Sequence, residues 1–259
     1  MKLLCLHGRG TNSDIFETQL ASIIHRLPKS YSFDFIDGEA AVNAAPQVAQ
    51  VYDGPYLAWH SSHFADEVAS AHEYVKDILE EDGPYDGVIG FSQGAALAAS
   101  LLMAHQIQHP DQPPLFKFAI FLCSVLPLSP SPAIGVEITD FVLNYESSYR
   151  SFFGISDEDV SVRAASCKTA YAYRSLNGSF GNIDEDQHGA YKIGIPTFHL
   201  LGQTDTFLDF SRYVLDLCER NIAEVFMNPG GHETPSSMES LERVVGLIQR
   251  VIELANTEY

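Results

Sequence analysis

The chain has 259 residues, of which 46% are hydrophobic, and it contains no low-complexity tract or flexible linker. We therefore expect one globular domain over residues 1–259. The formal net charge of −19 argues against nucleic-acid partners and anionic membranes, because both need a basic surface. Residues 1–30 are the exception, with four basic and two acidic residues, so an anionic ligand is expected to approach there.

The first half of the chain alternates strand and helix patterns. The apolar run at residues 2–8 predicts a short buried strand, too short for a signal-peptide core or a membrane span, so we expect a cytoplasmic protein. Residues 13–27 have apolar residues at helical spacing and predict a helix, with Ser13 as the expected N-cap. The remaining elements are a strand at 31–38, a helix at 64–81, a strand at 85–91 and a helix that follows it. This order predicts a parallel sheet.

The second half continues the alternation around one long insertion. Its expected strands are residues 116–124, 195–205 and 223–232, and its expected helices are residues 210–221 and 236–255. Together with the first half, they predict an α/β fold with a mostly parallel, doubly wound sheet flanked by helices.

Residues 125–194 are far longer than a crossover connection needs and are rich in aromatic residues. We expect a lid insertion over the carboxyl edge of the sheet, with Ser156 capping a helix that runs to about Leu176. A second small domain, whose aromatic residues form its own core, is the alternative.

The stretch GVIGFSQGAALAASLL, residues 87–102, contains the pattern G-x-S-x-G around Ser92. A β-branched and aromatic run precedes the serine, and an alanine-rich helix follows it. This strand and helix are the context that a nucleophile elbow requires, so Ser92 is the candidate nucleophile.

A serine hydroxyl needs a base, and the base needs an acid, in the chain order Ser, Asp or Glu, His. His232 lies in a glycine-rich loop after the last expected strand, and His188, in the insertion, is the alternative base. Asp205 directly follows the strand before it and is the candidate acid. Asp209 is the runner-up, with capping of the following helix as its more ordinary role.

Backbone amides must bind the oxyanion that forms during acyl transfer. Gln93 supplies the amide after the nucleophile, and Arg9 supplies one from the loop after the first strand. His7, Trp59 and Phe153 are candidate substrate contacts, although His7 also suits a hydrogen-bonded structural role and Trp59 a core position.

The four cysteines, Cys5, Cys123, Cys167 and Cys218, lack C-x-x-C spacing and are expected to be free thiols. The stretch HSSH, residues 60–63, contains residues of metal-ligand type but no complete ligand set. We therefore expect neither a metal nor another cofactor.

Five stretches in one order, LCLHGRGTNSDIFETQL, GPYLAW, GVIGFSQGAALAASLL, FHLLGQTD and PGGHETP, resemble the FSH family of serine hydrolases, a branch of the α/β-hydrolase fold. The resemblance spans nearly the whole chain and implies Ser92, Asp205 and His232 as the catalytic residues. The chain also resembles fungal members that act as thioesterases or esterases in polyketide pathways.

Three functional hypotheses follow from the residues and the resemblance. The first is hydrolysis of an ester or thioester of a hydrophobic acyl group, with release of a polyketide from an acyl carrier protein as a specific form. Carrier proteins are typically acidic, so the charge of this chain opposes such a partner unless the basic first segment forms the docking face. The alternatives are a carboxylesterase for small diffusible esters and a non-catalytic binding protein.

Overall fold

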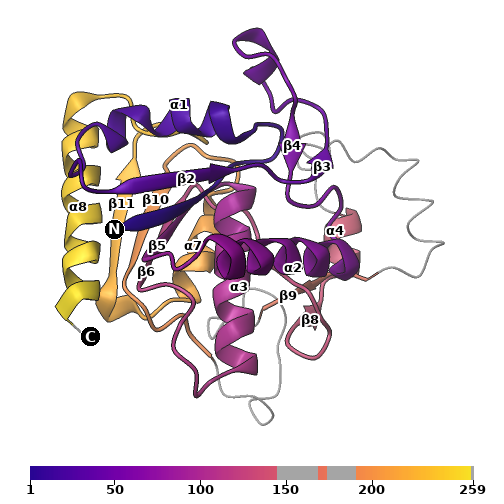
Figure 1. Ribbon diagram of the computed structural model, residues 1–259. Coiled ribbons are helices and arrows are strands. Elements are labelled where there is room, and N and C mark those ends of the chain that lie inside the picture. The colour runs from indigo at the N-terminus through magenta and orange to yellow at the C-terminus, as the bar shows by residue number, and fades with distance from the viewer. Residues whose placement is uncertain (145–168, 174–190, 258–259) are drawn as a thin grey trace.

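A sheet of six parallel strands forms the centre of the computed structural model, which describes residues 1–144, 169–173 and 191–257 (Figure 1). Its strand order is β11-β10-β6-β5-β1-β2, and each neighbouring pair is parallel. The strands are β1 (Lys2–Leu6), β2 (Ser32–Ile36), β5 (Gly87–Phe91), β6 (Phe118–Leu122), β10 (Thr197–Gly202) and β11 (Ala223–Asn228). The expected parallel sheet is confirmed.

Helices cover both faces of this sheet. Helices α1 (Ser13–Ile24) and α8 (Met238–Thr257) pack on one face, where Phe16 and Ile248 join the same apolar cluster as strand residues. On the other face lie α2 (Ala65–Asp82), α3 (Gln93–Gln108) and α7 (Leu208–Asp216). Figure 1 shows α1 and α8 on the side of the sheet opposite α3. The layers are those of a doubly wound fold.

The strand order reverses beside β1. Strand β1 lies between β2, which follows it in the chain, and β5, which comes later. The connections after β1 and β5 therefore leave in opposite directions, and a crevice forms at the carboxyl ends of these strands. The loop that contains Arg9 and the turn that contains Ser92 both begin at this edge.

Two helix starts differ from the sequence-based prediction. Asn12, not Ser13, caps α1: its side chain accepts a hydrogen bond from the Ile15 amide at 2.8 Å, and its backbone is extended. Helix α7 begins at Leu208, so Asp209 lies inside its first turn and pairs with Arg212 instead of capping the helix. The helical pattern thus located both helices but not their first residues.

Within the described residues, the smaller elements are two short sheets, one further helix and two turns of 3-10 helix. Strands β3 (Ala40–Ala41) and β4 (Leu57–Ala58) pair with each other, and β9 (Tyr171–Ala172) pairs with β7 (Leu128–Ser129) and β8 (Val136–Glu137). Helix α4 spans Thr139–Asn144, and the 3-10 turns span Val48–Gln50 and Arg220–Ile222.

The described part of the expected insertion packs against α3. The Tyr173 hydroxyl donates to the Ser100 carbonyl at 2.9 Å, and the Ser100 hydroxyl donates to the Leu128 carbonyl at 2.6 Å. Phe153 and Ser156 lie outside the described residues. The expectation that a helix runs from Ser156 to about Leu176 is wrong at its end, because Tyr171–Ala172 form strand β9, which pairs with β7 and β8. The lid interpretation of residues 125–194 stays a prediction.

None of the helices in the described ranges has the length and apolar composition needed to cross a membrane. Cys5, Cys123 and Cys218 are buried free thiols, as expected, and Cys167 lies outside the described residues.

Candidate active site

The turn between β5 and α3 holds Ser92 in an uncommon backbone conformation. Its φ is 53° and its ψ is −113°, a region that non-glycine residues seldom occupy. The turn is tight because Gly90 has no side chain: a Cβ atom there would lie 2.4 Å from the Ala95 nitrogen. This geometry is typical of a nucleophile elbow, in which the serine hydroxyl stands above the edge of the sheet.

The His232 ring connects Ser92 to Asp205. Its Nε2 lies 2.8 Å from Ser92 Oγ, and its Nδ1 lies 2.8 Å from Asp205 Oδ2. A carboxylate only accepts hydrogen bonds, so Nδ1 carries the proton and Nε2 accepts the proton of the serine hydroxyl. The structure thus brings together three residues that the sequence separates by up to 140 positions. The alternative base, His188, lies outside the described residues.

The surroundings hold the acid and the base in place. The Asp205 side chain is fully buried, and its second oxygen accepts a hydrogen bond from the Phe207 amide at 2.8 Å. The His232 ring lies between Phe91 and Phe207, with ring centroids 5.1 and 5.2 Å away. This role of Phe207 was not predicted, because its only signal in the sequence is its position two residues after the acid.

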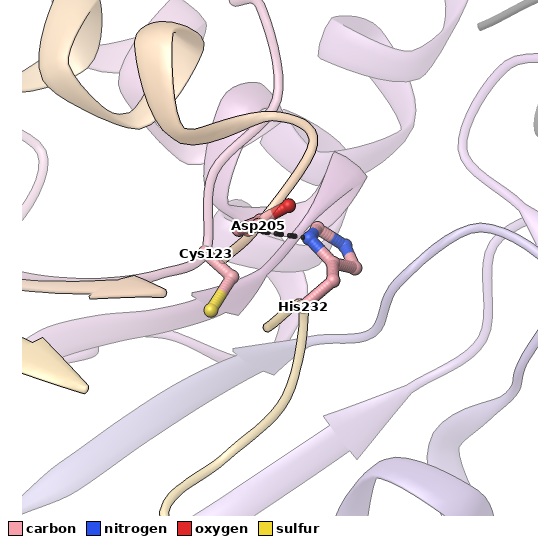
Figure 2. A group of neighbouring side chains, drawn as sticks. All are labelled: Cys123, Asp205 and His232. Atoms are coloured by element: carbon pink, nitrogen blue, oxygen red, sulfur yellow. Dashed lines mark hydrogen bonds and ion pairs between the residues drawn. The ribbon is translucent and has the colours of Figure 1, made fainter. Parts of the chain in front are cut away.

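Cys123 lies beside this pair of residues (Figure 2). Burial and the nearby Asp205 carboxylate raise the pKa of its thiol. One ligand atom each from Cys123, Asp205 and His232 lies within 4.8 Å of the others, a spacing that a metal ion can bridge. The carboxylate and the imidazole already share a hydrogen bond, however, and we interpret the group as an acid–base pair with a thiol packed behind it.

The loop after β1 lies directly against the elbow. A Cβ atom on Gly8 would lie 3.4 Å from the Ser92 Cβ and 2.9 Å from a ring carbon of Phe91. Arg9 follows Gly8, so its amide belongs to the segment in contact with the nucleophile. This placement is the one that an oxyanion-binding amide from the first loop requires.

His7 and Trp59 occupy buried structural positions. The His7 Nε2 accepts a hydrogen bond from the Gly38 amide at 2.9 Å, and the Trp59 indole donates to the His7 carbonyl at 2.8 Å. These contacts favour the structural alternatives for both residues over substrate contact. Phe153, the third candidate, cannot be compared because it lies outside the described residues.

A pocket begins beside Gln93 and follows one face of α3. Four α3 residues line it at positions i, i+3, i+4 and i+7, the spacing of one helical face. The full lining is His60, His63, Val68, Gln93, Ala96, Leu97, Ser100, Val125, Leu126 and Leu128. Most of these side chains are apolar, and the space between them has a volume of about 10 Å³, which is room for about one water molecule.

Solved structures of similar shape establish the fold. The carboxylesterase of Bacillus cereus superimposes with a TM-score of 0.52 at 15% identity, over 96% of this chain and 87% of that one. The Paleococcus ferrophilus monoacylglycerol lipase gives a TM-score of 0.51 at 15% identity, over 98% and 94% of the two chains. The protein has the α/β-hydrolase fold, as the sequence predicted.

Curated relatives are similar over almost their whole length. Esterase alnB of Emericella nidulans is 27% identical over 284 residues, which cover 100% of this chain and 99% of that protein. Hydrolase FUB4 of Gibberella moniliformis is 28% identical over 260 residues, covering 96% and 97% of the two chains. The family profile described as serine hydrolase (FSH1) matches residues 1–244. The chain therefore belongs to the FSH1 family of serine hydrolases.

Proposed function

We propose that this hydrolase cleaves an ester or thioester of a hydrophobic acyl group through an acyl-enzyme formed on Ser92. The observation that carries the proposal is the position of His232, 2.8 Å from both the Ser92 hydroxyl and the Asp205 carboxylate. This chain of hydrogen bonds allows one imidazole to move a proton during both halves of the reaction.

In the first half, Ser92 Oγ attacks the carbonyl carbon while His232 Nε2 takes the hydroxyl proton. Asp205 stabilises the resulting imidazolium, and the backbone amides of Arg9 and Gln93 bind the oxyanion. His232 then gives the proton to the leaving oxygen or sulfur, and the acyl group remains on Ser92. In the second half, His232 takes a proton from water, and the hydroxide attacks the carbonyl carbon of the acyl-enzyme. The bond from that carbon to Ser92 Oγ then breaks, His232 returns the proton to Ser92 Oγ, and the acid is released.

The specific form of this proposal is release of a polyketide acyl chain from an acyl carrier protein. The apolar side chains along α3, next to the nucleophile, favour a hydrophobic acyl group over a charged one. The similarity to fungal hydrolases supports a role in secondary metabolism. The mechanism requires no cofactor, and we infer a cytoplasmic location from the free thiols at Cys5, Cys123 and Cys218.

A second candidate function is hydrolysis of diffusible esters without a protein partner. The local contacts of the first segment favour it, because Lys2 pairs with Asp34 at 2.9 Å and Arg9 donates to the His60 carbonyl at 3.0 Å. The Asp34 carboxylate compensates the charge of Lys2, and the bond to His60 holds the Arg9 guanidinium against this chain, so the segment offers less to an acidic carrier protein.

Two experiments test the proposal. The first measures the intact mass after reaction with a fluorophosphonate for the wild type, Ser92→Ala and His232→Ala. We expect one adduct on the wild type, none on Ser92→Ala and slower labelling of His232→Ala. Absence of an adduct on folded wild type contradicts the proposal and favours the non-catalytic alternative.

The second experiment offers the same acyl chain as an oxygen ester, as a pantetheine thioester and as a thioester on a carrier protein. A kcat/KM at least tenfold higher for the carrier-bound form supports carrier-dependent release. Equal values for the carrier-bound and pantetheine forms, or preference for the oxygen ester, support the second candidate function.

A further inference from the structure

We propose that the backbone carbonyl of His60 positions both halves of the oxyanion hole, through the side chains of Arg9 and Gln93. The inference rests on the proposed function, which assigns the backbone amides of these two residues to the oxyanion. It assigns their side chains a second role, in which neither contacts the substrate and both act as positioning groups.

The two side chains converge on one oxygen atom. The Arg9 guanidinium donates to the His60 carbonyl with an Nη1 to O distance of 3.0 Å, and the Gln93 amide donates to it with an Nε2 to O distance of 2.9 Å. Gln93 also accepts a hydrogen bond from the Trp59 backbone amide at 3.0 Å. The loop after β1, the first residue of α3 and the segment after β4 are thus tied together at one place.

The segment from Trp59 to Ser62 is itself held on both sides of His60. On one side, the Trp59 indole donates to the carbonyl of His7, two residues before Arg9. On the other side, the Glu67 carboxylate accepts hydrogen bonds from the backbone amides and hydroxyls of Ser61 and Ser62. Burial acts to raise the pKa of Glu67, but these hydrogen bonds outweigh it and lower the pKa to about 2, so the carboxylate stays ionised near neutral pH.

The stretch HSSH, residues 60–63, therefore has a structural role that its metal-ligand residue types do not indicate. Its first residue offers a backbone carbonyl, and its two serines fasten that carbonyl to the beginning of α2. Burial lowers the pKa of the His60 ring to about 4, so the ring adds no positive charge beside the Arg9 guanidinium at neutral pH.

The consequence for catalysis is preorganisation. Amides bind a developing oxyanion best when their positions are set before the reaction, because no energy is then spent on moving them. Gln93 is only 2% exposed and makes its side-chain bonds from the same residue whose amide follows the nucleophile. Arg9 likewise supplies one amide of the oxyanion hole and holds the His60 carbonyl with its side chain. The shared carbonyl thus sets the distance between the Arg9 and Gln93 amides.

The first test replaces each side chain by one of similar length without hydrogen bonds, Gln93→Met and Arg9→Met. The controls are Gln108→Met, an exposed position on the same helix, and Arg26→Met, a half-buried arginine that also donates to a backbone carbonyl. The probe is hydrolysis of p-nitrophenyl butyrate, measured as kcat and KM, with thermal unfolding recorded for every variant.

We expect kcat to fall about tenfold in each test variant with KM changed less than about twofold, since an interaction that acts in the transition state lowers kcat and kcat/KM together. The two controls are expected to keep wild-type kcat and KM. A test variant that folds and keeps wild-type kcat overturns the proposal, and so does a loss confined to KM.

A second variant covers the case in which Gln93→Met does not fold. Gln93→Glu keeps the oxygen that faces the Trp59 amide but places an oxygen opposite the His60 carbonyl, where no hydrogen bond forms. We expect its kcat to fall about as far as that of Arg9→Met, or further, because a donor has been replaced by an acceptor. Wild-type kcat in Gln93→Glu overturns the proposal.

The double variant Arg9→Met/Gln93→Met tests whether the two side chains share one anchor. Independent effects multiply, whereas effects transmitted through a common carbonyl depart from the product of the single effects. A product within experimental error overturns the shared role of His60. Failure of the proposed function gives a different result. The wild type then does not hydrolyse the ester, and fluorophosphonate labels Ser92→Ala to the same extent as the wild type.

Discussion

Gly94, in the first turn of α3, lies against the carbonyl of Leu6 at the end of β1. A Cβ atom on this glycine would lie 2.1 Å from that carbonyl oxygen and 2.7 Å from the carbonyl oxygen of His7. The opposing atoms belong to the backbone of a buried strand and its loop, which cannot move aside as a flexible side chain can. The close approach of α3 to β1 brings Ser92 next to the loop that contains Arg9.

Gly94→Ala is expected to lower the free energy of unfolding by about 2–3 kcal/mol, because the added methyl group overlaps with backbone atoms. The matched control is Gly246→Ala in α8, where a Cβ atom meets nothing within 4 Å. There the greater helix propensity of alanine raises stability by about 0.5–1 kcal/mol. Urea unfolding of both variants measures the difference, and equal stability of the two contradicts the close contact.

Asp205→Asn is expected to lower kcat about 10³-fold or more with little effect on KM, because the amide no longer stabilises the protonated His232. Asp209→Asn is the control, since the Asp209 side chain is 90% exposed and pairs with Arg212 at the surface. Hydrolysis of p-nitrophenyl butyrate measures both variants. If Asp209→Asn loses more activity than Asp205→Asn, the acid has been assigned to the wrong residue.

His72 makes the folded protein sensitive to acid. It is 2% exposed, and burial lowers the pKa of its ring from 6.5 to about 3. Below pH 6.5 the unfolded chain therefore binds a proton at this residue that the folded chain does not, so stability falls as the pH falls. The contribution of one such histidine is about 1.4 kcal/mol per pH unit between the two pKa values.

His72→Gln keeps a hydrogen-bonding side chain opposite the Ser100 hydroxyl and removes the titrating ring. We expect its free energy of unfolding to fall less steeply than that of the wild type between pH 6 and pH 4.5, by up to about 1.4 kcal/mol for each pH unit. Urea unfolding at several pH values measures the slopes. Parallel curves for the two proteins would mean that His72 binds its proton at the same pH in the folded and the unfolded chain, which contradicts the lowered pKa.

The buried thiols are expected to resist alkylation in the folded protein. Burial raises the pKa of Cys5 and Cys123 and raises that of Cys218 to about 12, so the reactive thiolate is scarce at pH 8. Treatment with N-ethylmaleimide followed by peptide mass mapping is expected to find these three residues unmodified in native protein and modified in urea. Modification of native Cys123 contradicts its burial beside the loop of His232.

Much of the fold and of the site follows from local patterns. Alternating strands and helices predict the parallel sheet, and the strand, glycines and helix around Ser92 predict the elbow without long-range information. Asp205 and His232 are found because residues that follow parallel strands collect at one edge of the sheet, so their order in the chain predicts their neighbourhood.

The first residue of a helix is a feature that local sequence patterns do not fully predict. Asn12 and Ser13 are both good N-cap residues, and the sequence does not distinguish them. The fold does, because the Ser13 amide donates to Asp37 at 2.7 Å while the Asn12 side chain reaches the Ile15 amide. The partner Asp37 is 24 positions away and is set by the packing of β2.

The fold class, the candidate nucleophile and the candidate acid and base can be predicted without a structure, because each depends on a periodic pattern or on the order of strand ends. The structural positions of His7 and Trp59, and the contact of Arg9 and Gln93 with His60, become visible once the chain is folded. The His60 carbonyl accepts from Arg9, 51 positions away, and from Gln93, 33 positions away. Every residue has such a backbone carbonyl. A carbonyl has no sequence signature, so its role depends on the three-dimensional packing that brings two donors to it.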